Sequence, residues 1–141
     1  MSLIANAKLN KALNEMKLRQ PAEILRNVHL EIMDALHQSD ESSSAQDGMD
    51  ISLCVIDFTK QHIQFCGANT SLYFLSDNGI NEFKSNPLSI GGSLYGRKFS
   101  NQENPFETIE LSYKTGDQLF MFTDGFPDQL GGLENKKLNT T

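Results

Sequence analysis

The chain has 141 residues, which is enough for one ordinary domain with a single hydrophobic core. Its formal net charge of -6 argues against nucleic acid as a partner, because non-specific binding to a phosphate backbone depends on clustered Lys and Arg. No apolar run reaches the length needed to cross a bilayer, and the start of the chain lacks the basic and apolar regions of a signal peptide. We therefore expect one cytoplasmic domain that binds neither nucleic acid nor membrane.

The N-terminal part of the sequence predicts two helices. Apolar residues recur at helical spacing among strong helix formers, which predicts a first helix over residues 4–18. A second helix begins at Pro21, and its apolar face repeats as far as Leu36. We expect residues 1–38 to form a helical hairpin and the polar, serine-rich residues 39–48 to form a loop.

From residue 49 onward the pattern changes to that of strands. About six short runs rich in Ile, Val, Phe and Tyr are separated by turn sequences such as SDNG and KTGD. We expect residues 49–141 to form an antiparallel meander covered on one face by the helices, an α+β fold. The first run is apolar at nearly all of its positions, both those facing one side of the sheet and those facing the other, which is typical of a central strand covered on both faces. A long irregular connection joins Ser85 to Pro105, and loops of this length are often functional.

The cysteines and histidines do not predict a zinc site. Cys54 and Cys66 both lie in apolar strand-like runs, which favours buried reduced thiols, with a disulfide between them as the alternative. His29, His37 and His62 are scattered, without the spacing that zinc ligands require. We expect all three histidines to be surface or packed residues.

One aspartate stands where the last apolar strand is expected to end, in Thr123-Asp124-Gly125. Asp-Gly is a common turn, so a structural turn is one interpretation. The other is a ligand for Mg2+ or Mn2+, since hard cations take oxygen ligands. Asp50, at the head of the first strand, could approach a metal from the same sheet edge, whereas Asp47 is more simply a loop acid.

Two further segments combine turn residues with functional potential. In GAN, Gly67 and Asn69 predict a tight turn, with Asn69 as a turn former or, alternatively, a substrate contact. In NPLSIGG, Pro87 and Gly91-Gly92 predict a loop that needs positive φ at a glycine. The functional alternative for this loop is a flap beside an active site.

The ordered trio of GAN, PLSIGG and GDQLFMFTDG resembles the metal-dependent protein serine/threonine phosphatases of the PPM (type 2C) superfamily, in their SpoIIE-like branch. The resemblance runs from about residue 21 to residue 132. It implies an α-β-β-α sandwich whose cleft holds two Mn2+ or Mg2+ ions and a water that attacks phosphorus. It also implies a bacterial signalling protein that acts on a phosphoprotein substrate.

The resemblance implies roles for individual residues. Asp124 matches the metal-binding aspartate of the family's TDG motif, and Gly125 matches the glycine that lets the chain turn beside it. Asp50 or Asp47 lies near the place where some members carry an aspartate for a third, weaker metal.

Two metal-binding elements of the family have no counterpart here, namely its first Gly-Asp segment and its final aspartate pair. Gly116-Asp117 opens the last long strand and is better explained as a turn. We therefore expect an incomplete, middle-to-C-terminal portion of a phosphatase domain, inactive by itself, whose unpaired sheet edges favour a homodimer. The alternatives are a non-catalytic pseudo-phosphatase that binds a regulatory protein, and a small α+β interaction domain in which Asp124-Gly125 is only a turn.

Overall fold

The computed structural model describes residues 2–39, 48–92, 104–126, 128–131 and 136–137. The helices are α1 (Ser2–Asn10), the π-helical turn η1 (Lys11–Glu15) and α2 (Pro21–Ser39). The strands are β1 (Ile51–Asp57), β2 (His62–Ala68), β3 (Ser71–Ser76), β4 (Gly79–Lys84), β5 (Ile109–Ser112), β6 (Gln118–Phe120), β7 (Leu130–Gly131) and β8 (Lys136–Lys137).

Both predicted helical segments are present. The first ends at Glu15 rather than at residue 18, and Lys17 takes a φ of 54°, a left-handed conformation that a helix cannot continue through. The second begins at Pro21 as predicted, because proline's fixed φ and missing N–H suit a first helical position. Glu31 of α2 accepts ion pairs from Lys8 at 2.8 Å and from Lys11 at 2.9 Å, which join the two helical segments.

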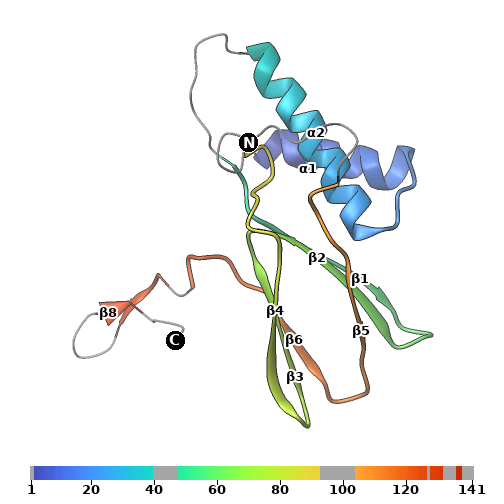
Figure 1. Ribbon diagram of the computed structural model, residues 1–141, viewed down its shortest axis with the longest axis vertical. Helices are drawn as coiled ribbons and strands as arrows, with labels where there is room; N and C mark the ends of the chain where they lie inside the picture. Colours follow the sequence, from blue (N-terminus) through green and yellow to red (C-terminus); the bar gives the residue numbers. More distant parts are fainter. Residues whose placement is uncertain (1, 40–47, 93–103, 127, 132–135, 138–141) are drawn as a thin grey trace.

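The strands form two three-stranded antiparallel sheets, with the orders β1-β2-β5 and β4-β3-β6, and a separate β7-β8 pair. The helices lie against the first sheet, and the β7-β8 pair lies apart from both sheets (Figure 1). The predicted antiparallel pairing is confirmed. The chain passes between the two sheets three times, from β2 to β3, from β4 to β5 and from β5 to β6, so consecutive strands of these sheets pair only in the hairpins β1-β2 and β3-β4.

β1 is an edge strand of the described sheet, so the prediction of a central strand was wrong. β2 occupies the centre, between β1 and β5. The apolar pattern of β1 arises because both of its faces are covered: Ile51 and Leu53 pack against the helical core, and Cys54 lies 3.5 Å, sulfur to sulfur, from Met121 beyond β6. The pattern therefore reports covered faces and not the number of neighbouring strands.

The main core lies between α2 and the first sheet. Its fully buried members include apolar residues of α2, β2 and the loop after β4, namely Ile24, Leu25, Val28, Ile32, Cys66, Ala68, Leu88 and Ile90. Each aliphatic side chain buried in this way contributes about 1.5–3 kcal/mol. On the opposite face of β2, Ile63 and Phe65 are buried, and so are Leu72 and Phe74 of β3. Helices therefore cover one face of the first sheet, and the second sheet lies on the other.

Within the described ranges, no helix has the length and apolar character to cross a membrane.

Candidate functional site

Asp124 lies on an exposed turn. The strand before it ends at Phe120, so the expectation that the strand runs straight into Thr123 was wrong. The turn is closed by backbone bonds from Phe126 N–H to the Thr123 carbonyl at 3.1 Å and from Asp128 N–H to the Asp124 carbonyl at 2.9 Å.

Aromatic stacking replaces strand pairing in this segment. The Phe122 ring stacks on Tyr73 of β3 with a centroid distance of 5.1 Å and an interplanar angle of 10°. Phe126 lies 5.3 Å from Phe122, so the two rings flank Asp124 in the sequence and hold its turn against the second sheet.

Gly125 does not need to be glycine for local reasons. Its φ lies outside the left-handed region, and the nearest atom to a Cβ built on it would be the Thr123 hydroxyl oxygen at 3.6 Å, an ordinary contact. The turn beside Asp124 therefore does not itself require a glycine, contrary to the role that the resemblance implied.

Asp50 is held by neutral donors from two distant segments. Its Oδ2 accepts a bond from the Asn69 side-chain amide at 3.0 Å, and its Oδ1 accepts one from the Ser89 hydroxyl at 2.5 Å. We call these three residues the Asp50 cluster. Asp47, the other aspartate considered near this position, lies outside the described residues.

The Asp50 cluster joins the GAN turn to the PLSIGG loop. Asn69 has a φ of 56°, which confirms it as a turn former in a conformation that Asn tolerates. Gly91 has a φ of 77°, which confirms the positive φ predicted for a glycine of the loop. The backbones of Met49 and Ile90 exchange two hydrogen bonds of 2.8 Å beside the cluster.

His29 is a buried residue of α2 that also contacts this loop, a role that the sequence analysis did not identify. Its Nδ1 accepts a bond from the Gly91 N–H at 3.1 Å, and its ring meets Phe106 edge-on at 5.8 Å. Burial lowers the pKa of the imidazole, so the neutral form that accepts this bond is favoured in the folded protein.

We expect His29 to make the stability of the fold depend on pH. Because its pKa is lowered on folding, the unfolded chain binds a proton first as pH falls below about 6.5, and stability declines from there towards the folded pKa. Thermal unfolding between pH 8 and pH 5 should show a weaker decline in His29→Gln than in the wild type. Equal declines in the two proteins would contradict this role.

The two cysteines are free thiols, as the sequence interpretation favoured over a disulfide, but only Cys66 is buried as predicted, and Cys54 is half-buried. Burial raises the pKa of Cys66 to about 12 and that of Cys54 to about 11. Neither thiol therefore presents a reactive thiolate at neutral pH.

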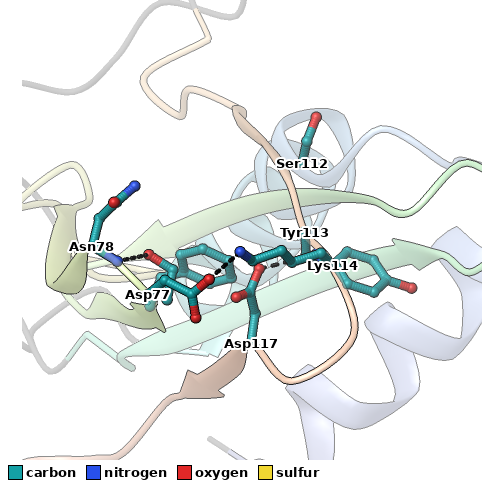
Figure 2. Close-up of a pocket in the computed structure, with 8 residues that line it drawn as sticks. Asp77, Asn78, Ser112, Tyr113, Lys114 and Asp117 are labelled. Carbon is teal, nitrogen blue, oxygen red and sulfur yellow. Dashed lines mark hydrogen bonds and ion pairs between the residues drawn. The ribbon is translucent and has the colours of Figure 1, made fainter.

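A cavity of about 470 Å3 opens between the β3-β4 turn and the β5-β6 connection. Lys114 forms an ion pair with Asp77 across it, and the Lys114 backbone N–H donates to the Asp117 carboxylate at 2.9 Å (Figure 2). Gly116 has a φ of 101°, which confirms Gly116-Asp117 as a turn. Because Lys114 is already paired, this cavity does not offer an uncompensated positive charge to a phosphate group.

The structure brings Asp50 together with Asn69 and Ser89, but it does not assemble a metal site from the residues that it describes. Among them, no group of three His, Cys, Asp or Glu side chains is placed to hold a metal ion. Asp124 is thus a well-exposed carboxylate on a defined turn, without a described set of partner ligands.

Comparison with solved structures assigns this architecture to a class. The SiaA-PP2C domain of Pseudomonas aeruginosa superposes with a TM-score of 0.75 at 26% sequence identity, over 99% of this chain and 50% of that chain. Helices on the first of two antiparallel sheets are therefore part of a PP2C-type phosphatase fold, the α+β class that was predicted.

The chain belongs to the SpoIIE family, described as stage II sporulation protein E, which matches residues 2–140. The phosphatase domain of the cell fate determinant SpoIIE from Bacillus subtilis also matches, at 16% identity over 93% of this chain and 50% of that one, with a TM-score of 0.44. Its manganese-presoaked form gives 17% identity, 93% and 51% coverage, and a TM-score of 0.47. The chain spans about half the length of these solved domains. A search of curated proteins finds no significant match.

Proposed function

We propose that this chain is part of a single metal-dependent protein serine/threonine phosphatase domain in a bacterial, cytoplasmic signalling protein. Its substrate class is a phosphoserine or phosphothreonine protein. The observation that supports this function is the exposed Asp124 carboxylate, on a turn packed against the second sheet of a SpoIIE-family fold.

The described residues do not by themselves make up a dinuclear metal centre. Hard cations such as Mn2+ and Mg2+ each take about six oxygen ligands, and Asp124 supplies at most two. Water would fill part of the coordination sphere, and further carboxylates would come from beyond the described residues. A bound metal would supply acidification of a water and neutralisation of phosphoryl charge.

The test is hydrolysis of p-nitrophenyl phosphate by the complete protein. We expect turnover with Mn2+, loss to background after treatment with EDTA, and recovery when Mn2+ is restored, because the water nucleophile depends on the metal. Turnover that resists EDTA would contradict metal dependence. A folded protein without turnover on this substrate or on a phosphopeptide would favour the second function below.

The second candidate is a non-catalytic module that binds a regulatory protein. The observation that favours it is the Asp50 cluster, in which both carboxylate oxygens already accept bonds from neutral donors. Assembly into a homodimer remains a proposal. It is supported by β1, β4, β5 and β6, each of which pairs on one side only within the described sheets.

A further inference from the structure

The bonding of Asp50 defines what its carboxylate does. A carboxylate only accepts hydrogen bonds, so Asn69 must present its NH2 group and Ser89 its hydroxyl hydrogen. The two donors lie 19 and 39 residues from Asp50 in the sequence. Asp50 therefore joins three separate segments of the chain, and each of its oxygens has a protein partner.

The segments joined by Asp50 are also connected through their backbones. The Asn69 N–H donates to the Asn86 carbonyl at 2.8 Å, at the start of residues 86–92, and Met49 and Ile90 exchange two bonds near the end. Leu88 and Ile90 are buried in the main core, whereas Ser89 between them projects to Asp50. Leu88 and Ile90 thus anchor the loop in the core, while Ser89 belongs to the Asp50 cluster.

A close approach of the backbone shows how tightly the loop is held. A Cβ built on Gly48 would lie 2.5 Å from the Ser89 Cβ and 3.3 Å from Gly92. Such contacts require glycine at position 48, two residues before Asp50. The loop, the head of β1 and the GAN turn therefore form one tightly packed unit.

We propose that Asp50 is a positioning residue, not a metal ligand: it fixes the GAN turn and residues 86–92 relative to the head of β1. The proposal does not depend on phosphatase activity, since it concerns bonds between side chains of this chain. It replaces the hypothesis that Asp50 is a ligand of a third metal ion.

Swapping the acid and the amide between positions 50 and 69 tests the proposal. Asn69→Asp places two carboxylates within hydrogen-bond distance, and it should raise amide hydrogen exchange at the backbone N–H groups of positions 69 and 90. Roughly three- to tenfold is expected for one lost exposed hydrogen bond. Adding Asp50→Asn should return exchange towards the wild-type rate, because the new amide can donate to the carboxylate introduced at position 69 and still accept from Ser89. Aspartate tolerates the left-handed φ at position 69 as asparagine does.

Exchange is measured by mass spectrometry on the complete protein, with the exposed Asn14→Asp variant as a control for added charge. Ser89→Ala, which removes one bond with little other change, should speed exchange at Ile90 a few-fold and covers the case in which Asn69→Asp fails to fold. Failure of Asp50→Asn to rescue Asn69→Asp would overturn the proposal.

Calorimetry with Mn2+ separates positioning from ligation. Asp50→Asn should leave the Mn2+ affinity of the complete protein within about threefold of wild type, because a lost ligand or its direct support costs ten- to a hundredfold. A larger loss would assign Asp50 to the metal and overturn the proposal. If the wild type binds no Mn2+, the proposed function fails, while the exchange experiment still decides the role of Asp50.

Discussion

Asp124→Asn is expected to lower Mn2+-dependent hydrolysis of p-nitrophenyl phosphate by at least about a hundredfold in the complete protein. Asn keeps the size of the side chain and removes its charge, and a metal that acts as a Lewis acid contributes several kcal/mol to the barrier. The change should leave packing intact because Asp124 is exposed, and its turn is held by backbone bonds and by Phe122 and Phe126.

The control for Asp124→Asn is Asp34→Asn, which makes the same chemical change at an exposed position of α2. It should keep wild-type turnover. Far-ultraviolet circular dichroism and Mn2+ calorimetry complete the comparison, because loss of a ligand should weaken metal binding without loss of fold. Full turnover in Asp124→Asn would mean that Asp124 is only a turn residue, and the metal-ligand assignment would be withdrawn.

Gly67→Ala is expected to destabilise the fold by about 3 kcal/mol, at the upper end of what overpacking a core usually costs. A Cβ on Gly67 would lie 2.6 Å from the Ser85 Cβ and 2.7 Å from the Thr70 carbonyl oxygen. Thr70 belongs to the short turn between β2 and β3, so its carbonyl oxygen cannot move without distorting that turn. Urea unfolding should therefore show a lower midpoint with an unchanged slope.

Gly125→Ala is the matched control. The added methyl group would lie 3.6 Å from the Thr123 hydroxyl oxygen, an ordinary contact, and the φ of Gly125 is one that alanine adopts without strain. Its stability should lie within about 0.5 kcal/mol of wild type. Equal losses in the two variants would show that the close approach at Gly67 relaxes without cost, contrary to our argument.

The sequence predicts much of this fold because its local signals agree with each other. Short apolar runs separated by turn residues, as in SDNG between β3 and β4, indicate β1 to β4, and Pro21 marks the start of α2. The status of β1 was mispredicted because periodicity reports whether a face is covered, and not which strand lies beside it. The end of β6 was mispredicted because stacking of Phe122 on Tyr73 takes over from strand pairing.

Less of the candidate site was predictable. Asp124 could be singled out because its motif is contiguous in the sequence. The contacts of Asp50 with Ser89 and of His29 with Gly91 join residues 39 and 62 positions apart, and no local pattern encodes such pairs. A buried histidine on an apolar helix face and a serine between two apolar loop residues were the available signals, and neither specifies a partner.

The pairing of β5 and β6 with strands far away in the sequence has a consequence for the order in which the protein assembles. β1-β2 and β3-β4 are hairpins of neighbouring segments, whereas β5 pairs with β2 through residues such as Gln64 and Glu110, 46 positions apart. Closing a long loop costs entropy before its contacts are gained, so non-local strand pairing slows folding. The two hairpins are therefore the natural early units, and β5 and β6, each of which completes one of the two sheets, are added late.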